Sequence, residues 1–349
     1  MRRAVILLLT ATAAGASAWS PQKSGSDAEL RGLAVFDATH AWASGAGGTF
    51  LRTAAGERWE KLTVSGGEAP SGEAPGVPLD FRDVEALDAE TIVLMSAGPG
   101  DASKIYKSTD GGKTWSLFHV NPDKDGFYDA IAFWDASHGI LLGDPVKGRF
   151  VVRITANAGR TWYAPKELQM PEALPGEGAF AASGTCLTVR RGGKEAWFVT
   201  GGAEVARVFR TEDRGRTWTA AATPLPAGKA TAGLFSVAFL DGMRGFVAGG
   251  DYKNAKLEAL NGARTEDGGK TWTPAPISKA GFYSAVVAVP GTQSDLVAVG
   301  PAGSAISHDA GKTWSPLDSK PPLNAVAFAG SDVGWAVGSK GAIVRFAKP

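Results

Sequence analysis

The sequence predicts an all-β protein that forms a single seven-bladed β-propeller of four-stranded antiparallel blades, closed into a ring by its N-terminal strand. Three observations lead to this prediction. A Thr-Trp phrase recurs along the chain, short apolar runs precede most copies, and the segment after residue 18 matches the one strand that the last copy lacks. Short strands repeated at blade-sized intervals are typical of propellers, in which each blade covers the apolar face of the next.

The recurring phrase has the form Ser/Thr-x-Asp-x-Gly-x-Thr-Trp and is clearest at residues 108–115. Its tryptophans recur at intervals of roughly 40–56 residues, and they are Trp59, Trp115, Trp162, Trp218, Trp272 and Trp314. Its acidic position holds Asp110, Asn157, Asp213, Asp267 and Asp309. An oxygen here can accept hydrogen bonds from loop N–H groups and close a turn, while a glycine takes the left-handed conformation. We therefore expect these side chains to be structural, with each indole buried between blades.

Each copy belongs to a larger unit whose strands we name a to d from the ring axis outward. In the last unit, strands a, b and c are predicted at residues 323–328, 334–338 and 342–346, and strand d is the segment that begins with the repeated tryptophan. Strand a recurs at 30–35, 81–86, 128–133, 234–239 and near 283–288. Four short strands in each unit are the signature of a propeller blade.

The start of the chain supplies the strand that the last unit lacks. Trp19-Ser20-Pro21-Gln22 resembles the strand d that begins at Trp314, whereas the last unit ends after strand c. We expect residues 19–22 to complete the last blade, which hides its open edge. Counting Trp19, seven tryptophans share one repeat position, so the sequence predicts seven blades.

The first eighteen residues have the features of a secretory signal peptide. Two arginines precede the apolar run 4–9, and small residues lead to Ala18. A basic start, a short apolar run and an A-x-A site are typical of exported proteins. We therefore expect a signal peptide at 1–18, a propeller domain at 19–349, and a periplasmic or extracellular location after cleavage near Ala18. The apolar run is too short to span a bilayer, and no transmembrane segment is expected.

Composition excludes several classes of partner and cofactor. The 36 Lys and Arg residues balance the 35 Asp and Glu residues, which argues against nucleic-acid binding. The four histidines are not at metal-ligand spacing, and no Gly-rich loop precedes a helix, so we expect no metal and no cofactor. The single cysteine, Cys186, lies in a strand-like run and is expected to be buried and inert. We expect a monomer.

The binding face should lie where the d–a connections and b–c loops meet, because the repeated c–d turns occupy the opposite face. Long loops on one rim of a rigid ring usually carry binding residues. The candidates there are Arg31, Arg82, Asp129, Asp144, Glu177, Phe235, Asp251, Tyr252 and Asn324.

A glycoside hydrolase is the alternative. Hydrolysis of a glycoside needs two carboxyl groups roughly 5–10 Å apart, and Asp129, Asp144, Glu177 and Asp251 are the candidates for such a pair. If two of these carboxyl groups lie in one deep pocket and one of them has a raised pKa, the structure would favour the glycoside hydrolase. A shallow rim would favour binding. Sialidases instead use a tyrosine nucleophile and three arginines, with an Arg-Ile-Pro segment that this sequence lacks.

The repeats resemble the Asp-box, or BNR, repeat, and the blade pattern is similar to that of the photosystem II stability and assembly factor family. Residues 323–328, 334–338 and 341–343 and the Asp boxes carry this resemblance, which covers nearly the whole chain after residue 18. Residues 127–135 and 246–252 also resemble a bacterial subgroup of such propellers that occurs outside phototrophs. The resemblance implies a non-catalytic propeller that binds a protein or glycan partner. The family's founding members bind through a basic patch, and no equivalent basic cluster occurs on the predicted face.

Overall fold

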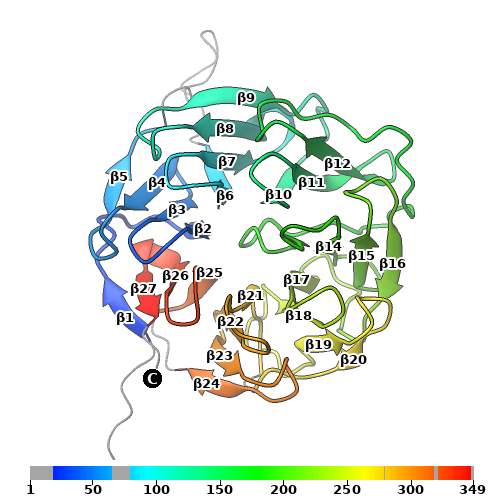
Figure 1. Ribbon diagram of the computed structural model, residues 1–349. Coiled ribbons are helices and arrows are strands. Elements are labelled where there is room, and N and C mark those ends of the chain that lie inside the picture. The colour runs from blue at the N-terminus through cyan, green and yellow to red at the C-terminus, as the bar shows by residue number, and fades with distance from the viewer. Residues whose placement is uncertain (1–18, 65–78, 279, 318–320, 347–349) are drawn as a thin grey trace, which may run out of the picture.

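The computed structural model describes residues 19–64, 79–278, 280–317 and 321–346. The predicted signal peptide, residues 1–18, lies outside the described residues. Seven antiparallel sheets surround a central axis (Figure 1), which confirms the predicted all-β propeller. The described part of the chain has no α-helix and only two 3-10 turns, η1 (Gly100–Ala102) and η2 (Ser339–Gly341). None of its helical segments has the length and apolar character needed to cross a membrane.

Each sheet is one blade, and its strands follow one another from the axis outward. The first two blades are β2 (Leu30–Val35), β3 (Ala41–Gly45), β4 (Thr49–Thr53) and β5 (Glu60–Leu62), then β6 (Asp80–Ala86), β7 (Ile92–Ala97), β8 (Lys104–Ser108) and β9 (Ser116–Val120). The third and fourth are β10 (Tyr128–Phe133), β11 (Gly139–Val146) and β12 (Arg149–Thr155), then β13 (Leu187–Val189), β14 (Ala196–Val199), β15 (Arg207–Thr211) and β16 (Thr219–Ala222). The fifth and sixth are β17 (Ala232–Phe239), β18 (Gly245–Asp251), β19 (Gly262–Thr265) and β20 (Thr273–Pro274), then β21 (Ala285–Ala288), β22 (Leu296–Gly300), β23 (Gly303–Ser307) and β24 (Ser315–Leu317). The seventh is β25 (Leu323–Phe328), β26 (Gly334–Gly338), β27 (Ile343–Phe346) and β1 (Trp19–Gln22).

The seventh blade combines both ends of the chain, as the sequence predicts. Strand β1 pairs antiparallel with β27, so that Trp19 lies opposite Phe346 and Gln22 lies opposite Ile343. This pairing covers the outer edge of β27, and the ring is closed because one blade contains strands from both ends of the chain (Figure 1).

The third blade has a reduced outer strand. Its fourth strand is represented by one bridge, in which Ile154 and Tyr163 exchange two backbone hydrogen bonds of 2.9 and 3.1 Å. Pro165 follows two residues later. Proline has no N–H to donate to a ladder, which explains why the pairing does not continue.

The repeated tryptophans pack between neighbouring blades. Trp115 of the second blade meets Phe50 of the first edge-on at 4.9 Å, and Trp314 of the sixth meets Phe246 of the fifth at 4.9 Å. All six repeated indoles are at most 9% exposed. Each therefore removes a large apolar surface from water at a blade boundary. Cys186 is also fully buried, and burial raises the pKa of its thiol well above the usual value.

The Asp boxes are self-contained turns. The Asp110 carboxylate accepts hydrogen bonds from the N–H groups of Lys113 and Thr114 at 2.9 Å and from the Thr114 hydroxyl at 2.6 Å. Although slight burial opposes it, these bonds lower the pKa of Asp110 to about 2. Gly112 has a φ of +92°, and a Cβ there would approach the Phe50 ring to 2.7 Å, so the position requires glycine.

These turns lie on the face of the ring where strand a leads into strand b. The Gly111 N–H donates to the carbonyl of Glu90 in the a–b turn of its own blade, at 2.9 Å, and Gly268 does the same to Met243 at 2.8 Å. The Asp-box carboxylates are therefore far from the d–a connections, which leaves those connections free to form a site on the other face.

Candidate functional site

The chain itself divides the central channel. Residues 178–186, here called the channel segment, lead into strand β13 and contact several other blades. Ala181 O accepts a hydrogen bond from Arg82 Nη1 at 2.8 Å, and Ser183 Oγ donates to Ser284 O at 3.0 Å. Thr185 Oγ1 lies 2.6 Å from Ser236 Oγ. The segment lines a hollow on each side of itself.

The hollow on the d–a side, here called the d–a pocket, has a volume of about 600 Å³. This size is within the range of small-molecule and peptide side-chain sites. Seven of the nine predicted binding-face residues line it, namely Arg31, Arg82, Asp129, Asp144, Phe235, Tyr252 and Asn324. The structure thus brings together residues that lie almost 300 positions apart in the sequence.

Two arginines on the inner strands of adjacent blades donate hydrogen bonds to the channel segment. Arg82 on β6 forms an ion pair with Asp80 at 2.7 Å besides its bond to Ala181 O. Arg31 on β2 lies 3.6 Å from Glu29 and donates to Ala182 O at 3.4 Å. Burial, together with the nearby charge of Arg82, lowers the pKa of Arg31. Both cations therefore already have a carboxylate and a carbonyl as partners.

Two carboxyl groups lie deeper in the d–a pocket. Asp129 on β10 is 1% exposed, and neither carboxyl oxygen makes a hydrogen bond of ordinary geometry within the described residues. The backbone N–H of Asp144 is close enough to favour the ionised form, but it donates to Phe127 O at 2.9 Å. Burial first, and then the charge of Asp144, raises the pKa of Asp129 well above its usual value. Asp144 on β11 is partly exposed, and its Oδ1 accepts the N–H of Ala179 at 3.0 Å. Burial raises the pKa of Asp144 to about 6.

Aromatic rings form another wall of the same pocket. Phe180 stacks on Phe235 with ring centroids 4.0 Å apart, and Phe282 meets Phe235 edge-on at 4.6 Å. Tyr252 stands 6.3 Å from Phe180 and is 45% exposed. Phe180 and Phe282 were not among the predicted residues. Phe282 immediately precedes a predicted strand a, and this position could have identified it as a pocket residue. Phe180 lies in a long connection with no repeat pattern, so no such indication was available for it.

The other two predicted carboxylates do not line the d–a pocket. Glu177 has a fully buried side chain that forms an ion pair with Arg207 and accepts a hydrogen bond from Thr200 Oγ1 at 2.6 Å. Asp251 accepts bonds from Thr231 Oγ1 at 2.8 Å and from the Lys253 N–H at 3.0 Å. Among the four candidates for a catalytic pair, Asp129 and Asp144 are the two that share a hollow.

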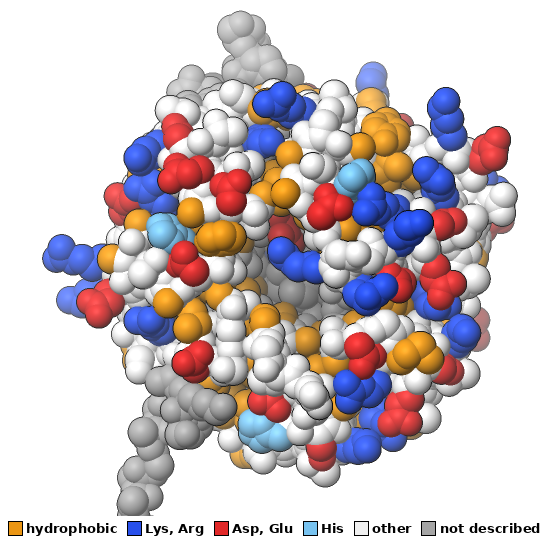
Figure 2. Space-filling view, viewed as in Figure 1, with side chains coloured by type: hydrophobic (Ala, Val, Ile, Leu, Met, Phe, Trp, Pro, Cys, Tyr) orange, Lys and Arg blue, Asp and Glu red, His pale blue; other side chains and the backbone are white. Residues whose placement is uncertain are grey.

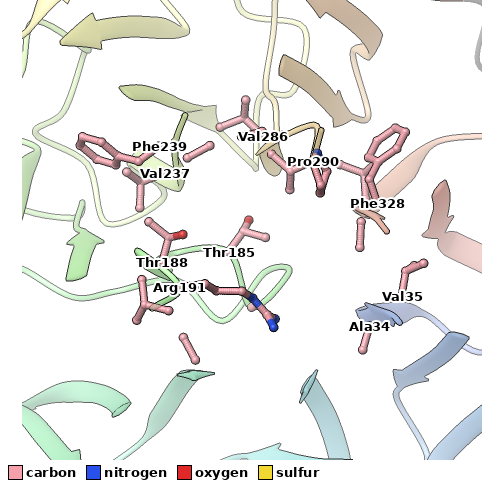
Figure 3. A pocket seen from close by; sticks show the side chains of 18 of the residues that line it. Ala34, Val35, Thr185, Thr188, Arg191, Val237, Phe239, Val286, Pro290 and Phe328 are labelled. Atoms are coloured by element: carbon pink, nitrogen blue, oxygen red, sulfur yellow. The ribbon is translucent and has the colours of Figure 1, made fainter. Parts of the chain in front are cut away.

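The opposite hollow has a volume of about 510 Å³ and lies on the Asp-box side. Apolar side chains such as Val237, Phe239 and Phe328 stand around it, and Arg191 extends into it (Figure 3). Acidic residues, among them Asp83 and Glu85, also line it. Arg191 lies 3.6 Å from Glu85. Figure 2 shows one face of the ring with acidic and basic side chains intermingled around a central hollow, and no continuous basic patch covers the described part of that face.

No group of three or more His, Cys, Asp or Glu side chains able to hold a metal ion occurs within the described residues. The d–a pocket instead offers the carboxyl groups of Asp129 and Asp144, two arginines that are already paired with other carboxylates, and an aromatic wall. Such a pocket can bind an amphipathic group, because it provides both apolar surface and oriented charge.

We expect Asp129→Asn to raise the free energy of unfolding at pH 8 by about 2 kcal/mol, because it removes a buried carboxyl that has no partner. In the folded protein Asp129 keeps its proton above pH 3.8, the usual value at which the unfolded chain loses it. The stability of the wild type therefore falls as pH rises from about 4.

The gain in the variant should accordingly disappear at about pH 3, below the usual pKa of 3.8, where Asp129 is mostly protonated in both the folded and the unfolded state. Urea unfolding at about pH 3 and at pH 8 measures it. An equal gain at the two pH values would contradict the assignment of the effect to the charge.

Together, the blades and the turns define this chain as a seven-bladed propeller built on Asp-box repeats. The model of the BNR/Asp-box repeat matches residues 106–117 and 305–316, in agreement with the sequence prediction. A search of curated proteins found no match.

Solved structures of similar shape include two of YCF48. One, described as YCF48 bound to D1 peptide, has a TM-score of 0.64 at 16% identity and covers 98% of this chain and 100% of that chain. The other, YCF48 from Cyanidioschyzon merolae, has a TM-score of 0.61 at 17% identity and covers 95% of this chain and 99% of that one. The predicted resemblance to the photosystem II assembly factors is thus confirmed at the level of the fold.

A GH74 xyloglucanase from Xanthomonas campestris is also similar, with a TM-score of 0.61 at 14% identity. The match covers 93% of this chain but only 53% of that enzyme. At such identities the similarity establishes the propeller fold and leaves function to the chemistry of the site.

Proposed function

We propose that this chain is a non-catalytic binding protein that holds a segment of another protein in the d–a pocket. The observation that carries the proposal is the composition of the pocket, in which aromatic rings and charged side chains line one hollow of about 600 Å³. Because the channel segment and the inner strands are anchored to each other, the pocket is preformed, and a preformed pocket spends little binding energy on ordering.

The comparison with YCF48 supports a peptide as the ligand, since that propeller is described with a bound D1 peptide. The predicted signal peptide supports a partner in the periplasm or outside the cell. Under this proposal the protein acts as an assembly or stability factor for an exported protein.

A library of peptides with blocked ends tests the proposal when it is screened against the full mature chain. We expect a subset of peptides to bind, and we expect Tyr252→Ala to weaken their binding by roughly tenfold, since an exposed tyrosine in a pocket is a common binding anchor. Tyr163→Ala is the matched control, because Tyr163 is 47% exposed, close to the 45% of Tyr252, and does not line the pocket. Equal losses in both variants, or no binding by the wild type, would refute the proposal.

The glycoside hydrolase stays the second candidate, because Asp129 and Asp144 share a pocket and both have raised pKa values. The burial of both oxygens of Asp129 argues against it, since a catalytic carboxyl must touch the sugar. Release of reducing sugar from xyloglucan by the wild type, and its loss in Asp144→Asn, would favour the enzyme over the binding protein.

A further inference from the structure

The charges of the d–a pocket do not balance. Its lining includes Glu29, Asp129 and Asp144 but only two cations, Arg31 and Arg82. Each of these arginines already has its own carboxylate, because Arg31 pairs with Glu29 and Arg82 pairs with Asp80, which lies beside the pocket. Among the described residues no ion pair reaches Asp129 or Asp144. The pocket therefore has two carboxyl groups in excess.

The second observation is the unmet hydrogen-bonding capacity of Asp129. The side chain is 1% exposed and borders the pocket, and neither of its oxygens makes a hydrogen bond of ordinary geometry among the described residues, the nearest donor being the Asp144 N–H. Buried polar groups in folded proteins are almost always paired, and an exception calls for a ligand or a functional reason. Asp144 stands beside it with one oxygen held by the Ala179 N–H.

The aromatic wall begins one residue further along the chain. Ala179, which anchors Asp144, is followed by Phe180, whose ring stacks on Phe235 at 4.0 Å. Tyr252 completes this wall. A long basic side chain suits such a neighbourhood, because its alkyl stem packs on aromatic rings while its charged end reaches carboxylates.

We propose, on the basis of the proposed function, that the d–a pocket recognises a basic side chain, arginine or lysine, of the bound protein segment. The cation lies against Asp144, Asp129 supplies a second negative charge behind it, and the alkyl stem lies along Phe180 and Tyr252. The pocket is less suited to a divalent metal ion, since two carboxyl groups provide only a small part of the coordination shell of such an ion.

The affinity should depend on pH. Without a ligand, both carboxyl groups favour the protonated form, because burial raises the pKa of Asp144 to about 6 and that of Asp129 well above its usual value. The neighbouring titratable groups are Arg82, which lowers the pKa of Asp129, and Asp83 and Cys186, which are buried and themselves have raised pKa values. A bound cation favours the ionised carboxylates, so binding should strengthen as pH rises through about 6.

The test uses peptides that the library screen selects, with acetylated N-termini and amidated C-termini. In each peptide the basic residue is replaced by citrulline for arginine or norleucine for lysine, which keep the shape and remove the charge. At pH 8 we expect the neutral peptides to bind roughly tenfold more weakly to the wild type or worse, the size expected for a lost charge pair. Asp144→Asn should remove this difference, and Asp129→Asn should reduce it.

Asp101→Asn is the matched control, because Asp101 is an exposed acid in a b–c connection outside the pocket lining, and it should leave the preference unchanged. Peptides that bind without any preference for a basic residue would overturn this inference and leave the proposed function standing. A preference that survives in both Asp144→Asn and Asp129→Asn would also overturn it. If the wild type binds no peptide, the proposed function itself fails.

Discussion

Deletion of residues 19–22 is expected to destabilise the whole ring. Trp19 is 4% exposed, meets Phe346 edge-on at 5.3 Å, and donates its indole N–H to Ser304 Oγ at 3.1 Å. Truncation of a buried tryptophan to alanine costs about 3–5 kcal/mol. Because Trp19 contacts the sixth blade as well as its own, Trp19→Ala alone should lower the free energy of unfolding by this amount.

Gln22 adds a second connection at the same junction. Its Oε1 accepts the indole N–H groups of Trp59 and Trp335 at 2.8 and 2.9 Å, and its Nε2 donates to Gly56 O at 2.8 Å. Loss of Gln22 leaves two buried donors without their partner, and each such group costs about 1–3 kcal/mol. The deletion should therefore cost more than Trp19→Ala.

Urea unfolding and limited proteolysis of the purified protein measure this effect. Ser20→Ala is the control, because Ser20 is exposed and its pairing with Arg345 uses the backbone. An unfolding midpoint of the deletion variant equal to that of Ser20→Ala would show that the ring does not depend on its N-terminal strand.

The closure was predictable because it follows from a local pattern. Trp19 occupies the same repeat position as the tryptophans that begin strand d in the other blades. A comparison of residues 19–22 with the segment that begins at Trp314 was therefore enough to predict that residues 19–22 form a strand d. The blades follow in the same way, since each Asp box closes with hydrogen bonds between residues at most four positions apart, as at Asp110. Patterns of this kind are visible in a sequence without any knowledge of distant contacts.

The interior of the d–a pocket was less predictable. The sequence placed most of its polar residues on the d–a face, because they begin strand a or follow strand b. It did not place the channel segment, where the fourth blade has a strand a of only three residues, β13. Phe180 and Ala181 find their partners through contacts such as that with Arg82, 99 residues away, which no repeat pattern encodes.

Residue type also failed to distinguish two buried acids. Glu177 and Asp129 were both predicted on the binding face and as members of a catalytic pair. The structure gives Glu177 four hydrogen bonds, from Leu174, Thr200 and two nitrogens of Arg207, and gives Asp129 none among the described residues. Their surroundings, rather than their chemistry, separate a carboxylate with a full set of partners from one that has no hydrogen bond of ordinary geometry.

The same contrast leads to the second large effect. We expect Glu177→Gln to lower the free energy of unfolding by about 3–5 kcal/mol, the cost of breaking a buried ion pair by removing one partner. The Glu177 side chain is fully buried and Arg207 is 14% exposed, so the guanidinium would keep its charge with little water around it. The amide of the variant would also present a donor where Arg207 donates.

Urea unfolding of this variant should be compared with that of Glu172→Gln. Glu172 lies in the same connection, is 79% exposed and is 3.8 Å from Arg149, so its replacement should change stability by less than about 0.5 kcal/mol. If Glu177→Gln kept full stability but lost a binding or hydrolytic activity, Glu177 would belong to the functional site instead. We expect Glu177→Gln to destabilise the protein and Asp129→Asn to stabilise it. Together these results would show that the protein keeps one unpaired buried acid at a cost in stability. A loss of stability confined to one position is characteristic of a functional site.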